Sequence, residues 1–169
     1  MDFQFKSISV EKEHIGIAFC DSKLRLIGYA KKLDQLSKKH ISSQLKSDLS
    51  FLNRKSKQFD YCVIHNPDNL KLSKLYIFKL KDYNNYSIRD FQILGGHLRS
   101  LISFYQEDKV GIYPDGIISK KVSFINGISE MLIGSLLASY KFNKYKKINN
   151  KDNKIKKPSR VKIYSSSYS

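Results

Sequence analysis

The chain has 169 residues, of which 41% are hydrophobic and 12% aromatic, so it can build the core of one ordinary domain. No apolar run approaches the ~18 residues that a membrane-spanning helix needs. The N-terminal stretch MDFQFKSISVEKEH lacks the apolar segment of a secretory signal. We therefore expect a cytoplasmic protein with no membrane partner.

The net charge of +16 is unevenly distributed along the chain. Residues 141–169 hold ten Lys or Arg and one acid, whereas residues 1–140 hold 21 Lys or Arg and 14 acids. Such a tail suits contact with nucleic acid, or it is a solvated linker. Only five of the 31 basic residues are Arg, the residue best suited to base reading and bidentate phosphate contacts. We favour the linker and keep the nucleic-acid site as the alternative.

The cysteines do not indicate a metal site. Cys20 and Cys62 each fall inside a predicted strand, and neither belongs to a CxxC pair. We interpret both as buried, reduced thiols rather than as a disulfide.

The first half of the chain predicts strands and short helices. Residues 3–10 and 15–19 have strand patterns, and the link between them is short enough for a hairpin. Residues 24–49 are predicted to be helical in two pieces. The first piece has an apolar face of Leu33, Leu36 and His40, and the second a face of Ile41, Leu45 and Leu49.

In the second half, strands predicted at 60–65, 75–80 and 109–113 alternate with helices. Ser87 is a suitable cap for a helix with Asp90 at its third position and an apolar face from Ile88 to Tyr105. This alternation favours an α/β fold with a mixed, mostly parallel sheet flanked by helices.

Residues 126–147 predict a final amphipathic helix that continues into a basic segment. Asn126 is its expected cap. The expected apolar stripe consists of Ile128, Leu132, Leu136 and Tyr140, widened by Ile133 and Leu137. Gly134, Ser135, Ala138 and Ser139 are small enough to let another element approach closely. A polar linker follows from residue 149, and residues 160–164 fit one more short strand.

The residues that could carry chemistry are few and scattered. His14, His40, His65 and His97 form no ligand motif, and no P-loop, GxSxG or GxGxxG is present. Gly95 and Gly96 lie within a helical pattern, where close packing or a kink is the expected role rather than phosphate binding. We predict no catalytic residue, no metal ligand and no cofactor. The candidate nucleic-acid contacts are Lys141, Lys144, Lys146, Lys147, Lys156, Lys157 and Arg160.

One segment resembles a known family. The stretch EMLIGSLLASYKFNKYK (130–146) is similar to the end of the N-terminal domain of the leucyl (cytosol) aminopeptidases. The matching positions are Glu130, Gly134, Leu137, Ala138, Tyr140, Phe142, Tyr145 and Lys146. Leu33-Asp34, His40-Ile41-Ser42 and Leu45-Lys46 resemble an earlier segment of the same domain, and residues 60–80 resemble the paired strands that come next.

The resemblance implies a macro-domain-like fold over residues 1–147, followed by a basic linker or tail at 148–169. In that family a C-terminal domain holds two divalent metal ions and performs the peptidase reaction, and the N-terminal domain helps to shape hexamers. We expect this chain to lack the catalytic domain, as a fragment or a truncated product, and to be inactive alone. Its expected partners are a catalytic aminopeptidase domain or further copies in a homo-oligomer.

The chain departs from the family pattern at two loops. NRKSKQ (53–58) stands where the family has a glycine-bearing connection, and Lys79–Asp82 stands where it has a glycine loop. The departures concern the loop geometry rather than the fold. The alternative function is a basic nucleic-acid-binding α/β module that acts through its Lys-rich C-terminal tail.

Overall fold

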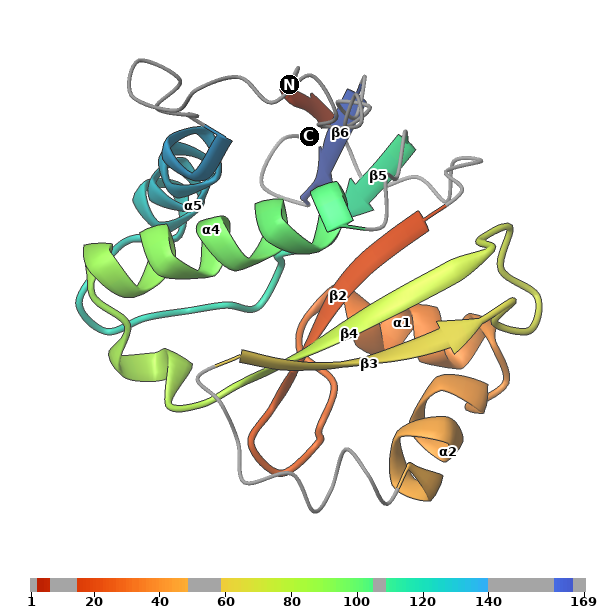
Figure 1. The fold of residues 1–169 in the computed structure, drawn as a ribbon. Helices are drawn as coiled ribbons and strands as arrows, with labels where there is room; N and C mark the ends of the chain where they lie inside the picture. The colour runs from red at the N-terminus through yellow and green to blue at the C-terminus, as the bar shows by residue number, and fades with distance from the viewer. Residues whose placement is uncertain (1–2, 7–14, 49–58, 105–108, 140–159, 166–169) are drawn as a thin grey trace.

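The structure is a computed structural model, and it describes residues 3–6, 15–48, 59–104, 109–139 and 160–165. The strands are β1 (Phe3–Lys6), β2 (Ile15–Asp21), β3 (Phe59–His65), β4 (Lys74–Leu80), β5 (Lys109–Ile112) and β6 (Arg160–Tyr164). The helices are α1 (Tyr29–Leu36), α2 (His40–Ser47), α4 (Ile88–Phe104) and α5 (Phe124–Ser139), with a 3₁₀ turn η1 (Tyr83–Asn85). Figure 1 shows their arrangement.

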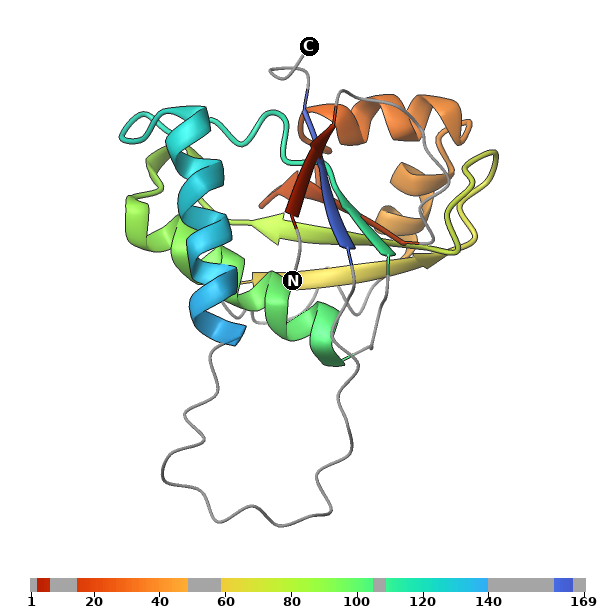
Figure 2. The same cartoon turned by 90° about the horizontal axis from the view of Figure 1, so that it is seen from above.

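The six strands form one sheet in the order β1-β6-β5-β2-β4-β3. All neighbours are parallel except β3, which is antiparallel to β4. The helices α1 and α2 lie on one face, and α4 and α5 lie on the other (Figures 1 and 2). This confirms the predicted α/β class with a mixed, mostly parallel sheet.

The central strand β2 is buried along its whole length because helices cover both of its faces. Ile15, Ile17 and Phe19 pack with α4 and α5, while Ala18 and Cys20 pack with α1 and α2. The apolar run IGIAF therefore belongs to a strand buried on both sides. Among the described residues, no helix combines the length and the apolar character required to cross a bilayer.

The start of α4 follows the prediction. The Ser87 hydroxyl and backbone N–H both donate to the Asp90 carboxylate, at 2.7 and 2.8 Å. The Asp90 N–H donates in return to the Ser87 hydroxyl oxygen at 3.4 Å, and this capping box satisfies polar groups at the first turn that otherwise have no partner inside the helix. The apolar face is also largely as expected, with Phe91, Leu94 and Leu98 buried, although Ile88 remains 51% exposed.

Two predictions about chain connectivity were wrong. The strand β1 does not form a hairpin with β2 but pairs in parallel with β6, from the far end of the sequence. The predicted strand at 160–164 is confirmed as β6, but it lies inside the sheet between β1 and β5. These residues therefore belong to the domain core and not to a tail, because Val161 and Ile163 are fully buried.

The last helix is rotated relative to the prediction. It begins at Phe124, and Ser123 occupies the cap position in place of Asn126, since the Gly127 N–H donates to the Ser123 carbonyl at 2.8 Å. The buried side of α5 consists of Gly127, Ile128, Met131, Gly134 and Ser135. The expected stripe is thus split, because Gly134 and Ser135 face inward, whereas Leu136, Leu137 and Ala138 face solvent.

Close contact with α4 explains this rotation. A Cβ atom on Gly134 would lie 2.0 Å from the Gln92 carbonyl oxygen, and one on Gly95 would lie 1.8 Å from that of Met131. The Ser135 hydroxyl donates to the Gly95 carbonyl at 2.8 Å. The predicted close-packing roles of Gly95 and of the small side of α5 are therefore confirmed. They meet each other at the crossing of the two helices.

Candidate functional site

The carboxyl edge of the sheet is where ligands bind in open α/β folds, at the point where neighbouring strands lead off in opposite directions. Here that point lies between β2 and β5. The chain leaves β2 through α1 and α2 toward β3, and it leaves β5 through α5 toward β6. The loops that follow β2 and β5 therefore form the first candidate site.

Direct backbone contact closes this crevice. Gly28, at φ 52°, lies against the loop that follows β5, and a Cβ atom at Gly28 would lie 1.6 Å from the Asp115 carbonyl oxygen. A Cβ atom at Gly116, whose φ is 86°, would lie 2.7 Å from the Gly28 backbone nitrogen. Both glycines are required because other residues rarely adopt these angles and no side chain fits between the two loops.

Three tyrosine rings fill the space behind this contact. Tyr113 stacks between Tyr29 and Tyr164, with ring centroids 5.4 and 5.2 Å apart. All three side chains are buried. The crevice is thus occupied by the protein's own aromatic side chains, which contribute packing where a ligand would otherwise lie.

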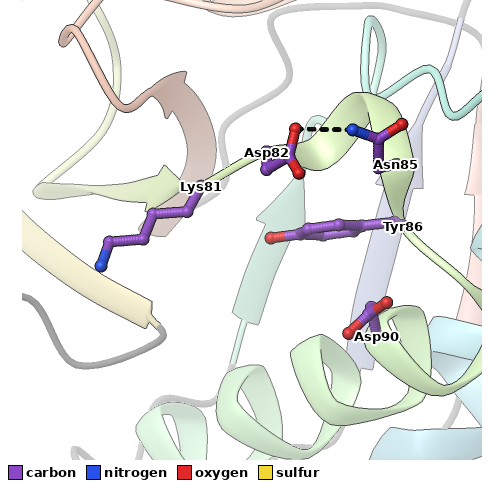
Figure 3. A pocket seen from close by; sticks show the side chains of 5 residues that line it. All are labelled: Lys81, Asp82, Asn85, Tyr86 and Asp90. Atoms are coloured by element: carbon purple, nitrogen blue, oxygen red, sulfur yellow. Dashed lines mark hydrogen bonds between the residues drawn. The ribbon is translucent and has the colours of Figure 1, made fainter.

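A second candidate is a cavity of about 220 Å³ that follows β4, lined by Lys81, Asp82, Asn85, Tyr86 and Asp90. Figure 3 shows the Tyr86 ring between η1 and the first turn of α4, with the Lys81 side chain extending away from the others. The cavity is smaller than the roughly 300–1,000 Å³ of typical ligand pockets.

The groups that line this cavity already have structural roles. The Asp82 carboxylate accepts a hydrogen bond from the Asn85 amide at 2.9 Å, and Asp90 caps α4. Burial raises the pKa of the Tyr86 hydroxyl, and the charges of Asp90 and Asp82 raise it further. Tyr86 therefore stays protonated at neutral pH.

The structure does not bring the histidines together. Across the described part of the chain, no group of three or more His, Cys, Asp or Glu side chains is placed to hold a metal ion. His40 lies 3.1 Å from the Asp68 carboxylate and links α2 to the turn between β3 and β4. Burial lowers the pKa of His97, on α4, and favours its neutral form. His14 lies outside the described residues.

The buried polar groups of the sheet lie beside the cysteines. Cys20, Lys79 and Asp60 occupy paired positions on the neighbouring strands β2, β4 and β3. The Lys79 ammonium is 3.7 Å from the Asp60 carboxylate, and both side chains are buried. Burial, with a smaller contribution from Asp21, raises the pKa of the Cys20 thiol to about 12. Cys20 and Cys62 are buried thiols that are not joined in a disulfide, as expected.

Of the predicted nucleic-acid contacts, only Arg160 lies within the described residues. It is exposed at the start of β6. The others, Lys141, Lys144, Lys146, Lys147, Lys156 and Lys157, lie outside the described residues.

The structure reveals an exposed apolar surface that the sequence analysis assigned in part to the core. We call it the outer face of α5; it consists of Ile125 (58% exposed), Ile133 (42%), Leu136 (48%) and Leu137 (64%). The helix carries one charged residue, Glu130, which accepts a hydrogen bond from Gln92. A helix that is apolar on nearly every side needs cover on its outer face as well. This apolar character on nearly every side of the helix is visible in the sequence and could have indicated the exposed apolar face.

No known family model and no curated protein sequence matches the chain. Solved structures do resemble it. The chain superposes on a lysine-to-glutamate mutant of tomato leucine aminopeptidase with a TM-score of 0.58 and 14% identity, over 98% of this chain and 32% of that one. The chain thus spans about a third of the aminopeptidase's length.

The macrodomain of Thermus aquaticus DarG gives a TM-score of 0.63 at 8% identity, over 97% of this chain and 98% of that one. The macrodomain of Mycobacterium tuberculosis DarG gives a TM-score of 0.56 at 12% identity, over 96% of this chain and 97% of that one. At these identities the likeness shows a shared fold. The macrodomain-like architecture expected from the sequence is therefore confirmed.

Proposed function

We propose that this protein is a non-catalytic docking module of the kind that forms the N-terminal domain of leucyl aminopeptidases. Its role would be structural, in oligomerisation or in regulation. The outer face of α5 is the observation that carries the proposal, because four large apolar side chains stand exposed on one helix. Contiguous apolar patches on soluble proteins commonly mark interaction sites. The expected occupant is a catalytic aminopeptidase domain or another copy of the module.

The closed carboxyl edge also supports a role without catalysis. The contact between Gly28 and the loop after β5, together with the tyrosine stack, places protein atoms at the point where ligands bind in open α/β folds. The metal-binding chemistry of the aminopeptidases would belong to a domain outside this chain, and no residue here inherits a part in it.

The test combines oligomeric state with activity. Without its partner, the apolar face should make the chain self-associate, which light scattering after size exclusion detects as a concentration-dependent mass. Leu136→Asp with Leu137→Asp should leave a monomer. Leu36→Asp should not, since Leu36 is 42% exposed but lies on α1.

The same preparations should not hydrolyse leucine p-nitroanilide with added Zn²⁺ or Mn²⁺. Metal-stimulated hydrolysis would contradict the proposal. So would a mass that the α5 substitutions leave unchanged.

The charge distribution favours a second candidate, a nucleic-acid-binding module that acts through its basic C-terminal segment. Residues 141–169 carry a net charge of +9. Because β6 lies inside the sheet, removing this whole segment would disrupt the fold, so its lysines must be substituted instead. Changing Lys141, Lys144, Lys146 and Lys147 to Gln should weaken binding to duplex DNA. Unchanged binding would rule these four lysines out as contacts.

A further inference from the structure

The two helix layers of this protein differ in charge. Residues 22–48, which contain α1 and α2, hold seven basic and two acidic residues, for a net charge of +5. Residues 81–104 and 113–139, which contain α4 and α5 with their connections, hold five basic and four acidic residues, for a net charge of +1. A general bias toward lysine in the composition would not by itself produce this difference. Of the two helix layers, the α1–α2 layer therefore carries the larger positive charge, and residues 141–169 hold a separate net charge of +9.

All seven basic side chains of this layer are exposed, and we call them the basic layer. They are Lys23, Arg25, Lys31, Lys32, Lys38, Lys39 and Lys46. Lys31 and Lys32 lie on α1, and Lys46 lies on α2. The remaining four lie in two turns, one before α1 and one between α1 and α2.

Unfavourable backbone angles are concentrated in these same turns. Among the described residues, six other than glycine have a positive φ. Three are Asn66, Asn69 and Asp82, residue types that tolerate this region. The other three are Leu24 (φ 60°), Lys38 (φ 52°) and Lys39 (φ 65°), and all of them lie in the segment that carries the basic layer. Such strain persists only where the surroundings enforce it.

An aspartate braces the first turn. The Asp21 carboxylate accepts the N–H groups of Lys23 and Arg25 at 2.9 Å each and the Arg25 side chain at 2.6 Å. Although burial opposes it, these hydrogen bonds lower the pKa of Asp21 and keep it ionised. The turn therefore holds Lys23 outward on a fixed backbone, while the exposed Arg25 side chain is paired with Asp21.

A second aspartate braces the turn between α1 and α2. The Asp34 carbonyl accepts the Lys39 N–H at 2.7 Å and the Ser37 hydroxyl at 3.0 Å. Its carboxylate accepts the Ser42 N–H at 2.8 Å. Lys38 and Lys39 thus stand exposed at a rigid corner whose backbone angles would suit glycine or asparagine better.

We propose that the basic layer binds the sugar-phosphate backbone of a nucleic acid without reading its base sequence. Lysine charges on braced turns complement a row of phosphates, and six of the seven residues are Lys rather than the base-reading Arg. The proposal shares its ligand class with the second candidate function but assigns the contact to a different surface. It does not depend on docking through α5.

The test measures fluorescence anisotropy of a labelled 24-base-pair DNA duplex and of one of its single strands, with the full chain at several salt concentrations. The test variant combines Lys31→Gln, Lys32→Gln, Lys38→Asn and Lys39→Asn. Its control removes the same charge elsewhere, with Lys6→Gln, Lys109→Gln, Lys120→Gln and Lys121→Gln, all exposed and outside the basic layer. A third variant changes Lys141, Lys144, Lys146 and Lys147 to Gln.

We expect the test variant to lose at least tenfold in affinity at 150 mM salt. The slope of log K against log salt should fall by about 0.9 for each phosphate contact removed from duplex DNA. Its melting temperature should equal or exceed that of the wild type, because Asn suits the two left-handed positions better than Lys. A weaker affinity with an unchanged or higher melting temperature would show that the variant has lost contacts to DNA and not its fold.

Three outcomes would overturn the proposal. Equal losses in the test and control variants would indicate attraction to net charge alone. A loss confined to the third variant would place the contact in the C-terminal segment and leave the second candidate function standing. A wild-type chain that binds neither DNA probe at 150 mM salt would exclude nucleic-acid binding through the basic layer and through the C-terminal segment. So would a chain that binds only vesicles of anionic lipid.

Discussion

At the scale of single residues, hydrogen bonds keep two carboxylates, those of Asp21 and Asp90, ionised. Two hydrogen bonds from Ser87, through its backbone N–H and its hydroxyl, lower the pKa of Asp90, and burial opposes them only in part. A carboxyl whose pKa is lower in the folded state stabilises the fold above its unfolded pKa, near 3.9, and loses that contribution as the pH falls through the folded pKa. The α4 cap should therefore weaken in acid.

The residue-scale prediction concerns Ser87→Ala. At pH 7 the variant should lose about 1 kcal/mol of unfolding free energy, the usual cost of removing a helix cap. The difference from wild type should shrink below pH 4 as Asp90 becomes protonated. Urea unfolding at pH 7 and pH 3 measures both values. Ser100→Ala, on the exposed side of the same helix, is the control and should show no such pH dependence. A constant difference across pH would argue against the role assigned to Asp90.

At the scale of elements, the crossing of α4 and α5 is built from backbone contact. Neighbouring glycines of α4 differ in what surrounds them. A Cβ atom at Gly95 would meet the Met131 carbonyl, whereas one at Gly96 would lie 3.8 Å from the Ala138 side chain, an ordinary contact. The two positions therefore form a matched pair.

We expect Gly95→Ala to cost roughly 3 kcal/mol or more, because the helices must separate to admit the methyl group. Gly96→Ala should be neutral or should gain up to about 1 kcal/mol from the higher helix propensity of alanine. Thermal or urea unfolding of the two variants checks this. Similar effects at both positions would mean that the crossing is looser than the structure shows.

At the scale of the whole molecule, the two faces of the sheet carry different surfaces. The α1–α2 layer has a net charge of +5, whereas the α4–α5 layer with its connections has a net charge of +1 and presents the apolar outer face of α5. The two proposed interactions use opposite faces, so both partners can bind at once.

Global unfolding should also control the reactivity of the cysteines. Burial raises the pKa of the Cys20 thiol to about 12, and Cys62 is buried as well. Since only the thiolate reacts, neither should be alkylated by iodoacetamide at pH 8 until the domain opens. Mass spectrometry should show no label in the native protein and two labels in urea. Rapid labelling of the native chain would mean that the α1–α2 layer opens locally.

Much of the element order could be predicted from the sequence, because hydrophobic period and turn residues act locally. The Ser87–Asp90 cap and the glycines at the α4–α5 crossing were recognisable from neighbouring residues alone. The orientation of α5 could not be predicted from the sequence, because apolar residues lie on nearly every side of this helix. Its buried side is the one whose residues allow α4 to approach. The basic layer was also missed, because its lysines gather only through the placement of α1 and α2.

The sequence by itself determined the α/β class, the strand and helix segments and the excess of positive charge. Tertiary structure alone decided that β6 joins β1 inside the sheet, since pairing between distant strands leaves no local pattern. It also decided that Gly28 and Tyr113 close the carboxyl edge and that Leu136 and Leu137 face outward. Local sequence specifies an element and its apolar residues, but the neighbours of that element determine which residues remain available for function.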